Sequence, residues 1–519
     1  MHETFRMNSI AMRLLIVVLF AALTVASFAF SVYLILIAKN IYVVALGFIF
    51  VVLSLIAGVY NTITAGSYYR SYFYGKHLEK IKAKLRPMHE YPTVAVIMPT
   101  YKEDLAVVEK NMRSMKTLRY ESKKIKFYLH DDSKDPLVKK RKRELCNELG
   151  FTYITRAENK DFKAGALNNS VAHSEGEFIA IFDADERLID RNFLLELLPY
   201  FQDGSVSFVQ SEKAYEMNSL FSEGVDLFNT LFFKFVQPAR ALHDTAIFAG
   251  SCGIVRRSAL EDIGGFPKYV TEDAFFSFEA DMHGYKSVYV PKIYALGKEL
   301  SFSELESQQW RYNYGGTQFL FYFLRCLREG KCKDIPLISK VDYFAYGFGM
   351  NYLSTFLIIF TLVALLTVFT TAQLSYTSFA QAVNVPFTVV GIEVVGLSSF
   401  LLSIIVPVVL TKTYFNSFSK GIMLSLLNVS LAFTRLKGAL SALSSLSGLN
   451  GWFKGTAINS TSARWFAALR TSAAELTFSG IFLLGGIGAA IAANMSGSLW
   501  LLWYGILYTS TFFFYYKYG

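Results

Sequence analysis

The sequence contains few cysteines and few charged residues. Four cysteines occur in 519 residues, and charged residues make up 18% of the chain. Cys326 and Cys332 lack the paired spacing of a zinc site, so we expect no structural zinc. All four cysteines (the others are Cys146 and Cys252) fall in the part of the chain that we place in the cytosol, where thiols stay reduced.

Signals of nucleic-acid binding are also lacking. The net charge is +10, but no basic cluster is interleaved with a motif that reads bases. We therefore expect no nucleic-acid partner. Attraction to anionic lipid headgroups and control of membrane topology suffice to explain the excess of Lys and Arg.

Long stretches of the chain have no charge at all. About 20 apolar helical residues cross a bilayer core roughly 30 Å thick. Six segments approach or exceed this length, and they predict six spans: Leu14–Ala38, Ile41–Gly66, a polar-interrupted run Tyr343–Ile392, Pro386–Thr411, Leu476–Asn494 and Ser498–Tyr516. The chain is thus predicted to be a multi-pass protein of the cell membrane.

Basic residues predict the orientation of these spans. Arg6 and Arg13 precede the first span, and a basic segment at residues 70–86 follows the second, whereas the predicted outer loops carry only Lys39. The positive-inside rule therefore places both termini and the large polar middle of the chain in the cytosol.

The polar middle alternates between two patterns. The strand-like runs "TVAVIMP", "KFYLH", "FTYIT", "FIAIF" and "VSFVQ" are separated by helical patterns. This order predicts an α/β domain with a mostly parallel sheet that is covered on both faces. Ligands of such sheets bind beyond the carboxyl ends of the strands. Acidic loops follow there: "TYKED", "DDS" and "DADE".

Asp183 and Asp185 follow a buried run so closely that a cation is expected near them. Mg²⁺ commonly takes one or two carboxylates and completes its shell with phosphate oxygens and water. The pair therefore favours a nucleotide diphosphate held through a divalent ion, although many such triplets are solvated turns. The run "KAGALNN" from Lys163 supplies a cation and a helix start that suits phosphate; an ordinary Gly turn is the alternative.

Two further segments carry candidate chemistry. Glu272 and Asp273 begin an apolar helix, either as helix-capping acids or as a general base that accepts a proton from an attacking hydroxyl. The run "QQWRYNYGG" from Gln308 combines aromatic rings and an Arg, which suits sugar stacking and diphosphate binding. Interfacial anchoring of a membrane helix is the alternative.

The remaining segments complete the predicted organisation. We prefer interfacial amphipathic helices over a seventh span for Gly421–Leu449, which carries Arg435 and Lys437. The predicted regions are a transmembrane hairpin at 1–70, the α/β domain at 90–310, an interfacial helix at 311–335, spans three and four at 340–412, interfacial helices and a gating segment at 413–475, and spans five and six at 476–519.

The order of the motifs "PTYKED", "DDS", "KAGALN", "DAD", "FAGSCGIVRRSALEDIGGF", "TED" and "QQWRY" resembles that of the processive membrane glycosyltransferases of family 2, such as cellulose and hyaluronan synthases. The resemblance covers roughly residues 90–330. It implies a GT-A fold and an inverting transfer from a UDP-sugar to a growing glycan, with Mg²⁺ or Mn²⁺ as cofactor.

The resemblance also implies roles for individual residues. Catalysis would involve Asp273, Glu272 and Arg311. Donor binding would involve Thr100, Tyr101, Glu103, Asp131, Asp132, Lys163, Gly165, Asp183 and Gln308. The metal would lie on Asp183 and Asp185. The acceptor end would be lined by Gly250, Ser251, Cys252, Trp310 and Tyr312.

The chain departs from the family pattern in two places. The Q-x-x-R-W signature ends in Tyr312, with a Trp at 310 instead, which weakens the assignment of the acceptor platform. The gating segment is degenerate, with Ile458–Arg464 or Trp452–Thr456 as candidates. Glu393 lies inside the fourth predicted span, where it faces either a glycan channel or the outer interface.

The sequence thus predicts an enzyme that polymerises a β-linked polysaccharide, with UDP-glucose as the favoured donor, and moves it across the bilayer. The nearest alternative is transfer of one sugar to a lipid acceptor, which would share the donor-site motifs. A non-catalytic protein that binds nucleotide sugar or glycan is a further alternative, and the intact acids Asp183, Asp185 and Asp273 argue against it.

Overall fold

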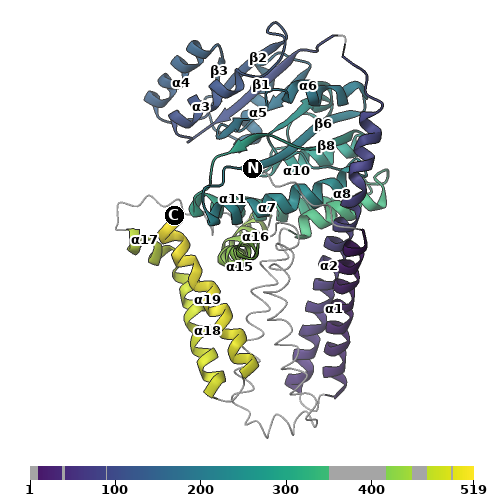
Figure 1. The fold of residues 1–519 in the computed structure, drawn as a ribbon, viewed down its shortest axis with the longest axis vertical. Helices are drawn as coiled ribbons and strands as arrows, with labels where there is room; N and C mark the ends of the chain where they lie inside the picture. Colours follow the sequence, from purple (N-terminus) through teal and green to yellow (C-terminus); the bar gives the residue numbers. More distant parts are fainter. Residues whose placement is uncertain (1–9, 38–40, 89, 350–416, 447–463, 492–494) are drawn as a thin grey trace.

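The structure is a computed structural model that describes residues 10–37, 41–88, 90–349, 417–446, 464–491 and 495–519. An α/β domain occupies one end, long helices extend from the other, and α7, α11, α15 and α16 lie between them (Figure 1). Glu393, most of the predicted third and fourth spans, and all but Arg464 of the two candidate gating segments lie outside the described residues.

A single sheet organises the α/β domain. Its order is β3-β2-β1-β4-β7-β6-β8-β5. The strands are β1 Val94–Thr100, β2 Ile125–Asp131, β3 Thr152–Thr155, β4 Phe178–Ile181, β5 Glu186–Leu188, β6 Val206–Tyr215, β7 Gly253–Arg256 and β8 Lys286–Gly297. The five strand-like runs recognised in the sequence correspond to β1, β2, β3, β4 and β6.

The sheet is mixed but mostly parallel, as expected: among the described strands, β5 and β7 run against the other six, and β6 pairs parallel with β8. Strands β1 to β4 are parallel neighbours. However, β7 pairs antiparallel with both β4 and β6, and β5 pairs antiparallel with β8. The strand-like runs recognised in the sequence did not include the segments of β5, β7 and β8.

Strand β1 shows why the sheet is covered on both faces. Successive side chains of a strand point to opposite faces. Val94, Val96 and Met98 pack on one face with Val108 and other residues of α3 (Leu105–Met115). Ala95 and Ile97 pack on the other face with α5 (Phe162–Ala172).

Local signals set the ends of the surrounding helices. Asp104 and Asp135 cap α3 and α4, and Gly150 ends α4 in a left-handed conformation with φ 68°. Ser301 forms a capping box with Glu304 at the start of α11. The other elements of the domain are α4 Pro136–Leu149, α6 Phe193–Leu197, η1 Leu198–Gln202, α7 Leu220–Leu231, η2 Phe232–Val236, α8 Gln237–Ala241, α9 Arg257–Ile263, α10 Glu272–Met282 and α11 Phe302–Arg328.

Helix α11 is longer than the sequence suggests. It runs without a break from Phe302 to Arg328, so the sequence-based boundary at residue 310 falls inside it. The helix lies across the base of the α/β domain, next to α16 (Figure 1). Its first half therefore belongs to the cleft described below, and residues 337–349 form a further helix after it.

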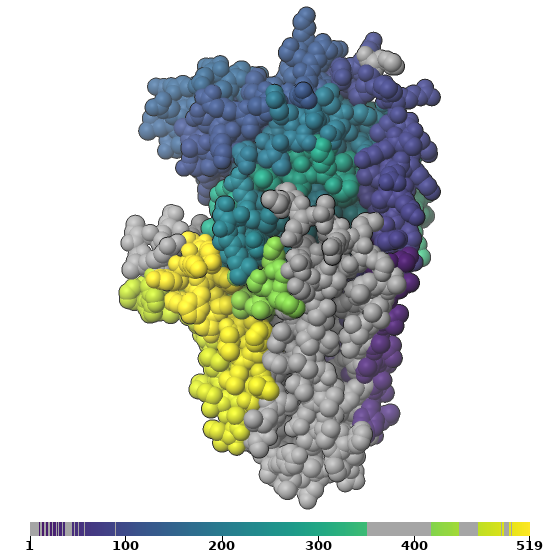
Figure 2. Space-filling model, viewed as in Figure 1, coloured from purple at the N-terminus to yellow at the C-terminus, as the bar shows by residue number. Residues whose placement is uncertain are grey.

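Two pairs of long helices extend away from the α/β domain, as the purple and yellow parts of Figures 1 and 2 show. They are α1 Ile10–Ile37 with α2 Ile41–Lys82, and α18 Ala473–Ile491 with α19 Met495–Tyr518. Among the described residues, one helical stretch, Gly47–Lys82, is long and apolar enough to cross a membrane; Thr24–Tyr33 and Ala473–Gly488 are shorter apolar stretches. This finding does not support the predicted count of six spans.

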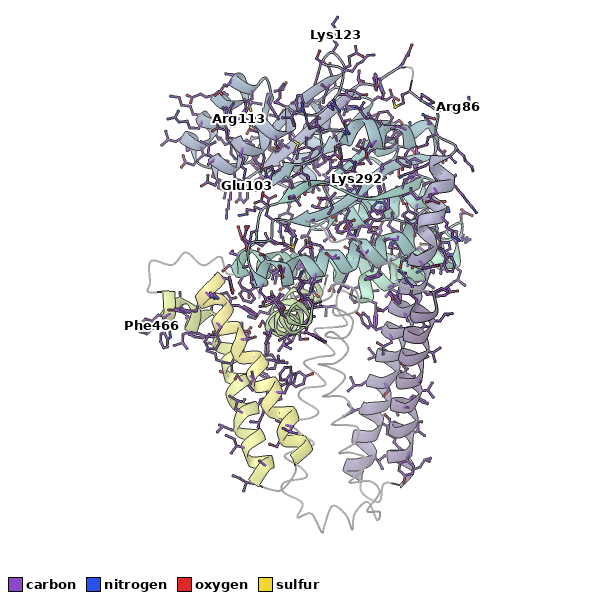
Figure 3. The ribbon with its side chains drawn as sticks, viewed as in Figure 1. Arg86, Glu103, Arg113, Lys123, Lys292 and Phe466 are labelled. Atoms are coloured by element: carbon purple, nitrogen blue, oxygen red, sulfur yellow. The ribbon has the colours of Figure 1, made fainter. Side chains whose placement is uncertain are left out.

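Three shorter helices lie between the long pairs and the α/β domain. They are α15 Phe418–Ser430, α16 Ala432–Leu446 and α17 Arg464–Thr471. Helices α15 and α16 turn across the long helices rather than running alongside them (Figure 1). Phe466 of α17 projects outward from the molecule (Figure 3) and is 64% exposed.

Candidate active site

A cleft of about 740 Å³ opens between the sheet and helix α11. It collects the loops that follow β1, β2 and β4, the loop before β7, and the starts of α5 and α10. Glu103 marks the edge of the α/β domain that faces α11 (Figure 3). Thirteen of the predicted site residues line this cleft: Thr100, Tyr101, Glu103, Asp132, Lys163, Asp183, Asp185, Gly250, Glu272, Asp273, Gln308, Arg311 and Tyr312.

Asp183 is held by two ammonium groups. Its Oδ1 pairs with Lys163 Nζ at 2.5 Å, and its Oδ2 lies 3.3 Å from Lys213 Nζ and accepts a hydrogen bond of 2.8 Å from the Ser251 hydroxyl. Burial disfavours the charged carboxylate, but the two lysines outweigh this effect and lower the pKa of Asp183 below its ordinary value. Asp183 is therefore ionised at neutral pH.

Asp185 lies two residues further along in a different environment. Among the described residues, no side chain donates a hydrogen bond to its carboxylate, and only its carbonyl oxygen has a partner, Lys298 N–H at 3.0 Å. Burial, followed by the charges of Asp183 and Glu186, raises the pKa of Asp185 to about 7. The cleft therefore contains a carboxylate whose negative charge is poorly compensated.

The Asp183–Asp185 pair fits a divalent cation by this chemistry. Within the described ranges, no three His, Cys, Asp or Glu side chains are arranged to hold a metal ion. A Mg²⁺-type site that shares its ion with a diphosphate needs only one or two carboxylates, because phosphate oxygens and water supply the rest. The excess negative charge at Asp185 is the observation that favours such an ion.

The base candidates Glu272 and Asp273 begin α10. Glu272 is 4% exposed, and burial together with the neighbouring charge of Asp273 raises the pKa of Glu272 to about 8. Burial also raises the pKa of Asp273. Asp273 Oδ1 accepts a hydrogen bond from Ala274 N–H at 2.8 Å, which leaves Oδ2 on the side of Gly250.

Gly250 keeps the neighbourhood of Asp273 Oδ2 open. A Cβ atom at this position would lie 3.2 Å from Asp273 Oδ2 and 3.4 Å from Lys163 Nζ. Gly250 also adopts φ +77°, a conformation that side-chain-bearing residues rarely take. Its carbonyl accepts a hydrogen bond of 3.0 Å from Lys163 Nζ. The glycine thus lets the Asp273 carboxylate and the Lys163 ammonium group lie close to one point of the cleft.

Helical geometry decides which aromatic residue of the Q-x-x-R signature faces the cleft. Gln308, Arg311 and Tyr312 are three and four positions apart, so they share one face of α11, and all three line the cleft. Trp310 lies off this face and stacks on Tyr314 with ring centroids 5.0 Å apart. Tyr312, and not Trp310, therefore lines the cleft.

The other end of the cleft holds the loops after β1 and β2. Tyr101 N–H donates to Glu103 Oε2 at 2.6 Å, and the Tyr101 ring is 37% exposed. Asp132 pairs with the guanidinium of Arg156 through bonds of 2.8 and 2.7 Å. A flat aromatic face beside polar acceptors suits a nucleobase.

Asp131 lies behind the cleft lining and has a structural position. It is fully buried and interacts with Lys142, Ser133 and Tyr153. Burial opposes ionisation, but the hydrogen bonds from Ser133 and Tyr153 and the charge of Lys142 lower the pKa of Asp131 overall. We therefore expect it to shape the β2 loop rather than to touch the nucleotide.

Three other predicted residues also lie outside the cleft lining. A Cβ at Gly165 would meet Arg156 Nη1 and Lys160 O at 2.2 Å, so this glycine permits a tight loop. Ser251 is fully buried and bonds to Asp183 and Glu186. Cys252 is 1% exposed with φ 51°. Their positions are consistent with support of the cleft from behind.

Two residues of β6 that the sequence analysis missed line the cleft. Lys213 reaches Asp183 and Glu186, and the Tyr215 hydroxyl accepts a hydrogen bond of 2.9 Å from Gln308. They are two positions apart on a strand and so share one face. The signal was the alternation at the end of the "VSFVQ" strand, which extends to Tyr215.

Comparisons with known proteins show what this domain is similar to. Residues 178–413 match the family model described as glycosyl transferase family group 2. The cellulose synthase catalytic subunit [UDP-forming] of Pseudomonas fluorescens is 32% identical over 239 residues, which cover 44% of this chain and 32% of that protein. Cellulose synthase 1 of Komagataeibacter xylinus is 31% identical over 209 residues, which cover 39% of this chain and 13% of that protein.

The alignment thus spans a third or less of the length of these relatives. Among solved structures, a mannosyltransferase from Pyrobaculum calidifontis in complex with GDP-mannose and Mn²⁺ has a TM-score of 0.48 and 18% identity, over 74% of this chain and 99% of that one. The resemblance to family-2 glycosyltransferases of the cellulose synthase type is confirmed.

Proposed function

Because the chain carries a family-2 glycosyltransferase domain with cellulose synthases among its relatives, we propose that it polymerises a β-linked glucan from UDP-glucose and exports it across a membrane. The observation that carries this proposal is the meeting of four motifs in one cleft. One cavity is lined by the "DAD" turn, Lys163, the "TED" helix and the Gln308–Arg311 face. These segments are far apart in the chain, since 148 positions separate Lys163 from Arg311.

The donor would lie with its nucleoside near Tyr101 and Asp132 and its diphosphate near Lys163. The structure gives the Lys163 ammonium two acceptors, Asp183 Oδ1 and the Gly250 carbonyl. An ammonium group has three N–H donors. Among the described residues, this leaves one donor of Lys163 for a phosphate oxygen. Mg²⁺ or Mn²⁺ on Asp183 and Asp185 would supply further positive charge to the diphosphate when bound.

Asp273 is proposed as the general base. Its Oδ2 would accept the proton of an acceptor hydroxyl while that oxygen bonds to the anomeric carbon and the bond from this carbon to the UDP oxygen breaks. A single displacement inverts the configuration, so an α-linked donor gives a β-linkage. The raised pKa of the Glu272–Asp273 pair suits a base that must bind and release a proton near neutral pH.

Arg311 and Tyr312 are proposed to contact the departing diphosphate and the acceptor sugar, respectively. Arg311 lines the cleft and can donate paired hydrogen bonds to the diphosphate that departs. Tyr312 offers a ring against which a sugar can stack. Fixed charges placed where negative charge develops are the largest contributors to many enzymatic rates.

We further propose that the long helices stand in a bilayer. Within the described part of the chain, their outward faces carry large exposed apolar side chains, a pattern that marks an interaction surface. Those at least half exposed are Val18, Val25, Leu36, Phe48, Val52, Leu55, Leu484, Ile487, Ile491, Ile506 and Phe513. A multi-pass arrangement with cytosolic termini stays a prediction of the sequence.

The test incubates the chain, purified in lipid, with labelled UDP-glucose and Mg²⁺ or Mn²⁺. We expect a long product that a β-glucan hydrolase degrades, together with release of UDP. Parallel reactions with UDP-N-acetylglucosamine and GDP-mannose check the choice of donor. Transfer of a single glucose to a lipid would contradict polymerisation and favour the alternative function, and an absence of any UDP release would contradict both.

A further inference from the structure

Lys213 has a place in the site that none of the recognised motifs assigns. It lies near the carboxyl end of β6, and its side chain is 18% exposed at the cleft wall. Its ammonium group meets three acceptors: Glu186 Oε1 at 2.9 Å, Asp183 Oδ2 at 3.3 Å, and the Ser251 hydroxyl. These acceptors belong to two different segments, the turn after β4 and the loop before β7.

The three acceptors decide what Lys213 can do. The ammonium group donates hydrogen bonds to Asp183 Oδ2 and to the Ser251 hydroxyl, and it forms an ion pair with Glu186 Oε1. Lys213 therefore ties two carboxylates and a hydroxyl together, whereas Lys163 contacts one carboxylate and one carbonyl. Lys213 lines the cleft, but its ammonium group is engaged by these protein partners.

Glu186 makes Lys213 necessary. Its side chain is 3% exposed, and its Oε2 accepts the backbone N–H of Asp183 at 2.9 Å, so it fixes the first residue of the "DAD" turn. A buried carboxylate of this kind must be paired. The neutral Ser251 hydroxyl also donates to its Oε1, at 2.7 Å. The positive charge beside Glu186 thus comes from Lys213.

We propose that Lys213 is the positioning residue that holds the "DAD" turn and the Gly250–Ser251 loop in register, so that Asp183 and Asp185 are preformed to receive a metal-bound nucleoside diphosphate. This inference rests on the proposed donor class. Lys213 acts through Asp183 and Glu186 and does not itself touch the substrate.

The chain offers a matched control on the same strand. Glu212, the neighbour of Lys213, lies outside the cleft lining, is 5% exposed at its side chain, and pairs with Lys234 Nζ at 2.6 Å. Lys234 does not line the cleft. Removal of either lysine leaves a buried glutamate without this ammonium partner, but only Lys213 is connected to the "DAD" turn.

The test measures UDP binding by calorimetry on the full chain in lipid nanodiscs, at saturating Mn²⁺, and then Mn²⁺ binding at saturating UDP. We expect Lys213→Met to weaken both by about 10- to 100-fold, the range seen when a partner of a metal ligand is removed. Lys213→Arg keeps a cation and should restore most of the affinity. Lys234→Met should lower thermal stability and leave both affinities at the wild-type value.

Each other outcome overturns the inference. Wild-type affinities in Lys213→Met, with only the amount of folded protein reduced, would assign Lys213 to general stability. If Lys213→Met does not fold, the double variant Lys213→Met with Glu186→Gln is measured instead, because it removes the unpaired buried charge. Wild-type affinity in the double variant would show that Lys213 only neutralises Glu186. A wild-type chain that binds neither UDP nor GDP would instead remove the proposed function, which separates the two failures.

Discussion

Asp183 and Asp185 are two residues apart, yet their surroundings differ sharply. Asp183 is held by Lys163 and Lys213, which lower its pKa, whereas burial and neighbouring acids raise the pKa of Asp185 to about 7. The first acid is therefore part of a fixed charge network, and the second presents unbalanced charge to the cleft. This division of roles depends on which side chains surround each acid, because the two residues are chemically identical.

Asp273→Asn tests the proposed base. The amide cannot accept a proton, so we expect kcat to fall by about 10²- to 10⁴-fold, the usual contribution of general base catalysis. UDP affinity, measured by calorimetry with Mn²⁺, should remain close to the wild-type value. The matched control is Asp281→Asn, in the same helix, outside the cleft lining and, like Asp273, half-buried. Comparable kcat in Asp273→Asn and wild type would exclude Asp273 as the base.

The pH dependence of the reaction tests the same pair. Because burial raises the pKa of Glu272 to about 8 and raises that of Asp273, the pair binds a proton as the pH falls through the neutral range. A protonated base is inactive, so kcat should rise with pH between about 6 and 8 and then level off. The measurement uses saturating UDP-glucose and Mn²⁺. A flat profile over this range would contradict the raised pKa.

Helix α11 connects the cleft to the helices below it. Gln308, Arg311 and Tyr312 face the cleft. On its other side, Glu306 accepts hydrogen bonds from Thr434 of α16 at 2.6 Å and from Tyr515 of α19. A displacement of α16 or α19 is therefore expected to reach the Q-x-x-R face through one rigid element.

Gly315→Ala tests how closely α11 must approach the base. A Cβ at Gly315 would lie 2.4 Å from Thr271 Cγ2, and Thr271 directly precedes Glu272 and Asp273. We expect kcat to fall by about tenfold or more, because small displacements of catalytic groups are costly, while UDP affinity changes little. Gly75→Ala is the control, since its Cβ would meet nothing within 4 Å. Unchanged kcat in Gly315→Ala would show that Thr271 can move freely.

The whole molecule combines a polar catalytic end with an apolar end. Charged residues such as Arg86, Arg113 and Lys123 cover the α/β domain (Figure 3), whereas apolar side chains cover the long helices. The four cysteines are at most 2% exposed. The native cysteines should therefore react little with thiol reagents. Labelling of a single introduced cysteine can then report on which side of a membrane it lies.

Introduced cysteines test the predicted topology. We expect Lys39→Cys to react with a membrane-impermeant maleimide in intact cells, because Lys39 lies in a predicted outer loop. Lys140→Cys, on the exposed side of α4, should react only after the membrane is opened. The wild-type chain should remain unlabelled in both conditions. Labelling of Lys140→Cys in intact cells would place the α/β domain outside and reject the proposed orientation.

The sequence alone determined the resemblance to family-2 glycosyltransferases, five of the eight described strands and thirteen of the residues that line the cleft, because motifs and strand periodicity are local and survive without knowledge of strand pairing. The tertiary structure decided the rest. Antiparallel β7 inserts between β4 and β6 and brings the Ser251 loop to Lys213 and Asp183. Contacts between segments this far apart in the chain depend on sheet order, which no local pattern encodes. For the same reason, only the fold revealed that Asp131 lies behind the cleft and that Trp310 turns away from it.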